Sequence, residues 1–311
     1  MNPAAPGVRT EARPRRPAGP PGRARAAFLI PAFVYVLFAF VVPVVYNLIL
    51  SFEQTSPATI ASLFAPFAGL ANYRATLLQP VTQSVIVRTF IFTAGSLFFQ
   101  FLIGFGLALL FNLRFPLNKL ARSLVIVPWL LPFLVTGFIF RFLFQLEAGA
   151  VNQVLVDLHL INQPIGYLLS PGWAYVTVLI TNIWLGVPFF TVLLFSALQD
   201  VPPELKEAAM IDGAGPWQTL VRVTVPVIRP VIEVTFVLGF VFTVKVFDIV
   251  ISLTQGGPAN STQLIATWAY NLSFQQFDYG AGAALNTVLL IIALLVAPIY
   301  IRLNRDSLRQ G

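Results

Sequence analysis

Residues 200–226 read DVPPELKEAAMIDGAGPWQTLVRVTVP and lie between two long apolar stretches. Asp200 is suited to the N-cap of a helix, and two prolines follow it in the position of a first turn. This helix is expected to end near Asp212 and Gly213, because glycine readily ends a helix. Pro216 then opens a second short helix. The stretch therefore predicts two short helices joined by a tight, glycine-rich elbow.

The predicted elbow carries small and apolar side chains. An apolar face on the first helix would consist of Leu205, Ala208, Ala209 and Ile211. A stripe on the second helix would consist of Trp217, Leu220, Val221 and Thr224. Pro226 and Pro230 then lead into the next apolar stretch. Such an element can be a rigid knob for a partner protein or an amphipathic linker lying on a bilayer, and the residues alone leave both open.

The composition places the rest of the chain in a membrane. Hydrophobic residues make up 57% and charged residues 10% of the 311 residues, against about 45–50% and about 25% in soluble domains. Cysteine is absent and His159 is the single histidine, which excludes disulfides, thiolate metal sites and multi-histidine sites. The sequence predicts no cofactor and no metal. The net charge of +7 comes from short basic stretches between apolar segments rather than from a nucleic-acid-binding face.

Six segments have the roughly 20 apolar residues that a helix needs to cross a bilayer. They are residues 27–51, 88–111, 122–145, 172–198, 232–254 and 282–302. Prolines interrupt several of them, which spanning helices tolerate where neighbours satisfy the freed backbone groups. The fold class predicted is therefore an all-α integral membrane protein with six spans and a cytoplasmic loop at about 200–230.

Lysine and arginine indicate the orientation of these spans. Six arginines lie in residues 1–26, and three basic residues each lie in the second loop, in the fourth loop and after residue 301. Because basic residues concentrate on the cytoplasmic side, both termini are predicted to be cytoplasmic. Residues 1–26 are expected to form a disordered basic tail, residues 27–303 the membrane domain and residues 304–311 a C-terminal tail.

The loop resembles the EAA loop of ABC-importer permeases. Glu207-Ala208-Ala209, then Gly213, then Pro226 follow the spacing of that motif. The resemblance implies that the loop is a coupling helix seated in a cleft of a separate ATPase. It implies coupling roles for Glu207, Ala208, Ala209, Asp212, Gly213, Ala214 and Pro226. The chain contains no G-x-x-x-x-G-K-[ST] phosphate loop, so it is predicted to be non-hydrolytic and to need an ATP-hydrolysing partner.

Two groups of residues inside spans are candidates for a substrate path. Lys245 and Asp248 are three residues apart and are expected on one helical face, either facing the path or neutralising each other in a salt bridge. Asn182, Leu185, Gly186 and Phe189 fall at i, i+3, i+4 and i+7 of another span. There, Gly186 with Pro188 is expected to open space, Asn182 to bind a hydroxyl and Phe189 to stack on a sugar ring. Ordinary helix packing is the alternative for this second group.

These same segments resemble permeases of maltose-type importers. Residues 182–190, NIWLGVPFF, are similar to the N-x-W-L-G-x-P-Y segment of that family. Residues 247–258, FDIVISLTQGGP, are similar to its F-N/D-x-I-x-x-L-T-x-G-G-P stretch. The resemblance implies a sugar site made of Asn182, Leu185, Gly186, Phe189, Lys245 and Asp248. The charged pair departs from the asparagines of the maltose protein, which favours a different saccharide or a phosphorylated polyol.

The resemblance also implies the assembly and location. The partners would be a second permease, two ATP-binding subunits, an extracytoplasmic solute-binding protein and the lipid of a bacterial plasma membrane. Two other classes remain as alternatives. An ion-coupled secondary transporter could use Lys245 and Asp248 as a charge relay, although such folds usually carry inverted repeats. A membrane anchor or assembly factor would not need buried charges.

Overall fold

The structure is a computed structural model that describes residues 22–303 except 56, 58 and 60–64. These described residues form helices and connecting loops, and their one β-bridge joins Glu53 to Phe67. The predicted all-α fold is confirmed. The predicted C-terminal tail and residues 1–21 of the predicted N-terminal tail lie outside the described residues.

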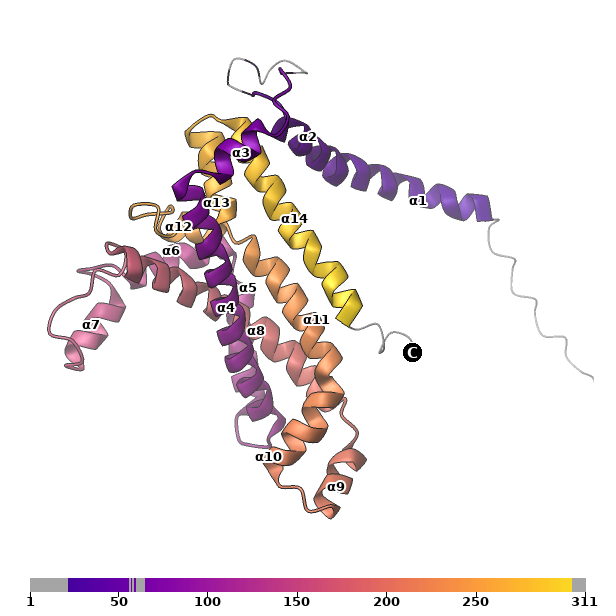
Figure 1. The fold of residues 1–311 in the computed structure, drawn as a ribbon. Coiled ribbons are helices and arrows are strands. Elements are labelled where there is room, and N and C mark those ends of the chain that lie inside the picture. The colour runs from indigo at the N-terminus through magenta and orange to yellow at the C-terminus, as the bar shows by residue number, and fades with distance from the viewer. Residues whose placement is uncertain (1–21, 56, 58, 60–64, 304–311) are drawn as a thin grey trace, which may run out of the picture. The chain divides into compact units, whose positions relative to one another are not determined.

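The helices follow one another as long and short elements (Figure 1). Up to the middle of the chain they are α1 Gly22–Val36, the π-turn η1 Leu37–Val41, α2 Val42–Ser51, α3 Ala71–Leu77, α4 Pro80–Asn112, α5 Asn118–Leu130, α6 Phe133–Leu143 and α7 Ala150–Asp157. They continue as α8 Pro171–Gln199, α9 Pro203–Ile211, α10 Pro216–Thr219, η2 Leu220–Thr224, α11 Val225–Val244, α12 Asp248–Leu253, α13 Ile265–Tyr270, η3 Asn271–Gln275 and α14 Tyr279–Leu303.

Five helices in the described chain are long and apolar enough to cross a membrane. They span Leu29–Ser51, Pro80–Asn112, Pro171–Gln199, Pro216–Val244 and Tyr279–Val296. A sixth crossing is reached if α5 and α6 count as one, but these two helices are bent by 102° at their junction. The third span predicted over 122–145 is therefore not one continuous helix but two helices joined at a bend. Leu131 precedes Pro132 and has extended backbone angles there, because proline disfavours helical angles in the residue before it.

The fifth span also differs from the prediction of 232–254. α10, η2 and α11 form one continuous helix from Pro216 to Val244, so the second short helix of the elbow is the beginning of the span. The helix then ends at Val244, and α12 starts separately at Asp248. The break carries neither proline nor glycine, and Phe247 within it packs on Tyr270 with ring centroids 5.2 Å apart.

The chain divides into two compact units, residues 1–46 and 47–311. In the first unit, α1 begins at Gly22, so its first five residues fall within the predicted tail of residues 1–26. From Leu29 to Tyr46 this unit carries no charged residue, which suits a helix whose solvent is lipid.

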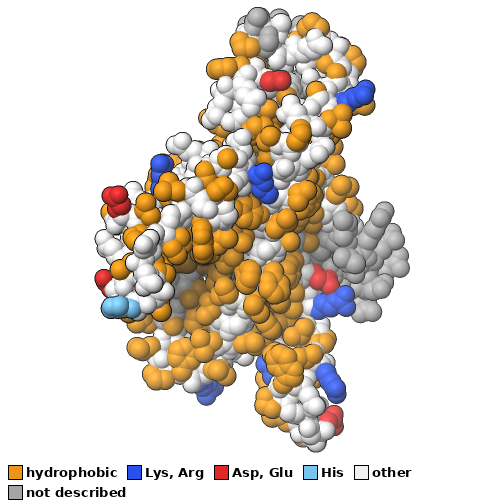
Figure 2. Space-filling model, turned by 60° about the vertical axis from the view of Figure 1, so that its left-hand side comes forward, with side chains coloured by type: hydrophobic (Ala, Val, Ile, Leu, Met, Phe, Trp, Pro, Cys, Tyr) orange, Lys and Arg blue, Asp and Glu red, His pale blue; other side chains and the backbone are white. Residues whose placement is uncertain are grey.

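In the second unit, α4 and α8 pack along each other and α11 lies against both. Their interface is filled by Leu97 of α4, Phe190, Leu194 and Leu198 of α8, and Ile228 of α11. The elements α9 and α10 lie at one end of this unit, and α3 and α13 lie at the other (Figure 1). Figure 2 shows hydrophobic side chains covering much of one face, with few charged side chains among them.

Candidate functional site

A cavity of about 440 Å³ opens between α4, the α5–α6 bend, α8 and the break that separates α11 from α12. It is lined by Gln100, Trp129, Phe133, Asn182, Leu185, Gly186, Phe189, Gly239, Phe242, Thr243, Lys245, Val246, Phe247, Asp248 and Ile249. All the residues predicted to bind substrate are in this set. The structure thus brings together two groups that are more than fifty residues apart in sequence.

A buried polar network joins α4 to α8 at the cavity wall. The side-chain Nδ2 of Asn182 donates to Ser96 Oγ at 2.9 Å, and Gln100 Nε2 donates to the backbone oxygen of Asn182 at 3.0 Å. Within the described residues, Asn182 Oδ1 and Gln100 Oε1 accept no hydrogen bond. Asn182 therefore serves helix packing, as the alternative prediction held, and also places an unused acceptor at the cavity wall.

Gly186 has a different role from the one predicted for it. A Cβ atom added at Gly186 would come within 2.3 Å of the side-chain amide of Gln100. The space beside Gly186 is therefore filled by Gln100 rather than left open. The absence of a side chain on α8 allows this amide to reach the cavity wall.

Aromatic rings form the apolar side of the cavity. The Phe189 ring lies 6.1 Å from the ring of Trp129 and 5.7 Å from the ring of Phe242, centroid to centroid, both edge to face. Such pairs are favourable because the positive ring edge meets the negative ring face. The cavity thus combines flat apolar surfaces with the polar atoms of the opposite wall.

Lys245 and Asp248 line the cavity from two different elements. Lys245 caps the C-terminal end of α11, and Asp248 is the first residue of α12. The prediction that they share one helical face is therefore wrong, because the helix breaks between them. The salt-bridge alternative is also wrong, since the ion pair found among the described residues joins Arg229 to Glu233 at 2.7 Å. Instead, the Lys245 Nζ lies 5.8 Å from the centroid of the Phe242 ring.

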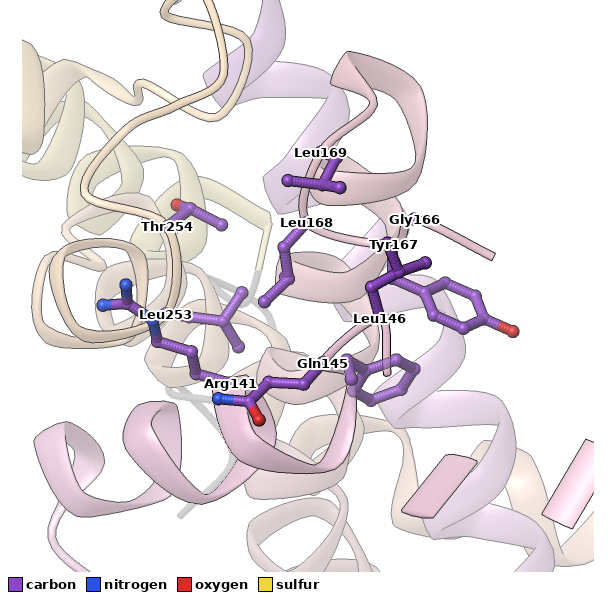
Figure 3. Close-up of a pocket in the computed structure, with 10 residues that line it drawn as sticks. Arg141, Gln145, Leu146, Gly166, Tyr167, Leu168, Leu169, Leu253 and Thr254 are labelled. Carbon is purple, nitrogen blue, oxygen red and sulfur yellow. The ribbon is translucent and has the colours of Figure 1, made fainter. Parts of the chain in front are cut away.

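A second cavity of about 300 Å³ lies between α6, the segment before α8 and the end of α12. Figure 3 shows the guanidinium of Arg141 and the hydroxyl of Thr254 on one side of it, with the ring of Tyr167 pointing away from both. None of the predicted site residues lines this cavity. It offers fewer polar groups in a smaller space, so the first cavity is the better candidate for a substrate site.

The loop after α8 carries the residues predicted to contact an ATPase. In α9, Glu207 and Ala208 are exposed and Ala209 is buried. Gly213 has a φ of +81°, which the elbow requires and which glycine adopts without strain. The remaining predicted residues, Asp212, Ala214 and Pro226, are exposed or half-buried. Large apolar side chains also face outward here, since Ile211 is 86% and Trp217 74% exposed.

Residues 100–309 match the family of binding-protein-dependent transport system inner membrane components. The chain is 34% identical over 286 residues to the sulfoquinovosyl glycerol transport system permease protein SmoG of Agrobacterium fabrum, covering 90% of this chain and 89% of that protein. It is 30% identical to the trehalose/maltose transport system permease protein MalF of Thermococcus litoralis, covering 77% and 80%. The chain belongs to this family.

A solved structure shares the fold of this permease. It is a bacterial ABC transporter involved in the import of the acidic polysaccharide alginate, with a TM-score of 0.79 at 23% identity over 91% of this chain and 95% of that one. The resemblance inferred from the EAA and maltose-type motifs is thereby confirmed at the level of family and fold. Family membership also favours the permease over the two alternatives, the ion-coupled transporter and the anchor.

Sequence reasoning missed several residues that line the cavity of the permease. Gln100 could have been found, because it is an isolated polar residue in an apolar span. Trp129 and Phe133 could not, because they reach the cavity only through the bend between α5 and α6. Phe242 and Thr243 precede the unpredicted break at the end of α11, and Phe247 lies within it.

Proposed function

We propose that the chain is the permease subunit of an ATP-driven importer for a sugar or a related polyol. The observation that carries the proposal is the cavity, in which side-chain oxygens of α4 and α8 face aromatic rings. Its two charged side chains, Lys245 and Asp248, form no ion pair with any residue that the structure describes. Hydroxyl groups of a sugar need donors and acceptors, and its apolar faces need flat surfaces. Relatives named for sugar transport support the same class of substrate.

Individual roles follow from the chemistry of the cavity. Asn182 and Asp248 would accept hydrogen bonds from hydroxyl groups, and Phe189 would stack on a ring. Leu185 and Gly186 shape the α8 wall. Lys245 would donate to hydroxyl groups or neutralise an anionic substituent, which extends the substrate class to acidic and phosphorylated sugars.

The proposed assembly contains a second permease, two ATP-binding subunits and an extracytoplasmic solute-binding protein. The chain has no phosphate-binding loop for ATP, so a separate subunit would supply the energy. Exposed Glu207 and the apolar residues around the elbow would seat in that subunit. Closure of the ATPase pair would move this element and reshape the cavity, because the two states differ in their contacts. Both termini and the elbow would be cytoplasmic, as the basic residues indicate.

The test is uptake by the complete importer, purified with its natural partners and placed in liposomes with ATP inside. Labelled sulfoquinovosyl glycerol, trehalose, maltose and lactose form the panel, because relatives carry these names. We expect uptake of at least one of them, and its loss when the nucleotide site of the ATPase partner is disabled. Uptake that continues without ATP hydrolysis would contradict the proposal.

A further inference from the structure

Four aromatic side chains form a row that begins at the cavity. Phe247 lines the cavity, and its ring centroid is 5.2 Å from that of Tyr270. The Tyr270 ring is 5.0 Å from Phe274, and Phe274 is 6.5 Å from Tyr279. The row therefore continues without a gap from the break after α11, along α13 and η3, to the start of α14.

One face of α13 and η3 is buried and the other carries this row. Ile265, Trp268 and Leu272 are buried in a core shared with α4, α11 and α14. On the opposite side, Tyr270 is 39% and Phe274 60% exposed. The two residues are four apart across one helical turn, so their exposed surfaces adjoin.

Side-chain amides accompany the exposed rings. Gln276 Nε2 donates to Asn271 Oδ1 at 2.7 Å, and Asn271 Nδ2 donates to Gln275 Oε1 at 2.5 Å. Among the described residues, the Nε2 of Gln275 and the Oε1 of Gln276 have no further partner. Placing unused amide groups against lipid hydrocarbon is costly, so this face is expected to meet water.

We propose that the aromatic row is a conducting surface along which sugar rings pass between the solute-binding protein and the cavity. α13 lies at the end of the unit opposite to α9 (Figure 1), which is the extracytoplasmic end in the proposed orientation. The face of an aromatic ring carries negative potential, which attracts the polarised C–H bonds on the flat face of a pyranose. Unused amide atoms beside the rings exchange hydrogen bonds with its hydroxyl groups.

This inference rests on the proposed function, and one variant series separates the two. The complete importer in liposomes is compared with importers carrying Phe274→Leu or Phe274→Trp, using whichever sugar of the panel the unmodified importer transports. The measured quantity is the sugar transported per ATP hydrolysed. Leucine keeps the apolar volume without a flat ring, and tryptophan keeps the ring.

We expect Phe274→Leu to lower the amount of sugar transported per ATP hydrolysed by about fivefold. The loss of one aromatic contact weakens binding by about this factor. Phe274→Trp should retain most of this transport, and ATP hydrolysis should persist in both. Phe98→Leu is the matched control, because Phe98 is 59% exposed on α4 and is no part of the row. It should leave the ratio unchanged.

Two results would overturn the proposal. If Phe274→Leu matches the unmodified importer, ring stacking plays no part in transport. If Phe274→Leu loses the other subunits on purification, the row packs against protein instead of sugar. Failure of the unmodified importer to move any sugar of the panel would reject the proposed function itself, and the row with it.

Discussion

Met210 and Ile211 of α9 are exposed, whereas Asn182 and Leu185 of α8 are buried against α4. The elbow that follows α9 and the α8 wall of the cavity also use glycine differently. Gly213 has open space around it and supplies a left-handed turn, while Gly186 lies inside helix α8 and makes room for the side-chain amide of Gln100. Substitutions in α9 should therefore act on association with a partner, and substitutions in the cavity should act on packing and transport within the chain.

The largest effect is expected from Glu207→Lys. Charge reversal at an interface leaves a mismatched pair and costs at least about 2 kcal/mol, or about 30-fold in affinity. The ATPase should be lost on purification and uptake should fall accordingly, while the permease remains folded in the membrane. Glu204→Lys, a change on an exposed glutamate in the first turn of the same helix, is the control. If the two variants had equal effects, Glu207 would make no specific contact with the ATPase.

Gly186→Ala should destabilise the permease itself. The added methyl group meets the Gln100 amide, and overpacking of this kind costs about 1–3 kcal/mol. Thermal unfolding of the purified permease in detergent measures the change. Gly106→Ala is the control, because a Cβ atom at Gly106 has no neighbour within 4 Å. If both variants unfold at the temperature of the unmodified protein, the Gln100 amide does not occupy this position.

Asp248→Ala should weaken transport while the importer stays assembled. A hydrogen bond to a charged group contributes about 1.5 kcal/mol or more, which corresponds to a rise of about tenfold in the KM for uptake. Asp157→Ala in α7, an exposed position outside the cavity, should have no effect. If the KM for uptake were unchanged in Asp248→Ala, this carboxylate would not contact the substrate.

Gly213→Ala should give the smallest change. Alanine at a φ of +81° is strained by about 1 kcal/mol, so the elbow should hold the ATPase more weakly, by about fivefold. Gly215→Ala is the matched control, because Gly215 has a φ of −71° and open space around it. Co-purification of the ATPase at increasing detergent concentration measures both. Equal retention would show that the turn is not needed for coupling.

The spans and the elbow were predictable to the extent that a single physical rule dominates each of them. Hydrophobic length located the spans predicted at 27–51 and 172–198 to within two residues at each end, but it missed the start of the second span and both ends of the fifth. The elbow was visible from Gly213 and Pro216. The prediction that Asp200 is the N-cap of the first elbow helix is wrong, because Asp200 caps the C-terminal end of α8 and Pro202 occupies the N-cap of α9. The grouping of the cavity residues of α8 and α11 came from a resemblance in sequence. The i, i+4 spacing of Asn182 and Gly186 alone was equally compatible with packing, and the structure shows that packing is part of their role.

Breaks in the helices could not be predicted, for two different reasons. At Leu131 and Pro132 the local signal was present, but proline is tolerated in many spanning helices, so the bend of 102° depends on how α6 packs against α12. At Lys245 no local signal exists. That break is stabilised by tertiary contacts such as Phe247 with Tyr270, and it moves Lys245 and Asp248 onto separate elements.

The most direct test of the central claim uses the absence of cysteine from this chain. Ile211→Cys provides one thiol at the most exposed of the large apolar side chains of α9, and the complete importer carrying it is treated with a short bifunctional thiol-to-amine cross-linker. Leu294→Cys, in the exposed part of spanning helix α14, is the control. We predict a covalent product between position 211 and the ATP-binding subunit, and none from position 294. Labelling of position 211 by a lipid-soluble thiol reagent, with no product linked to the ATP-binding subunit, would contradict the account.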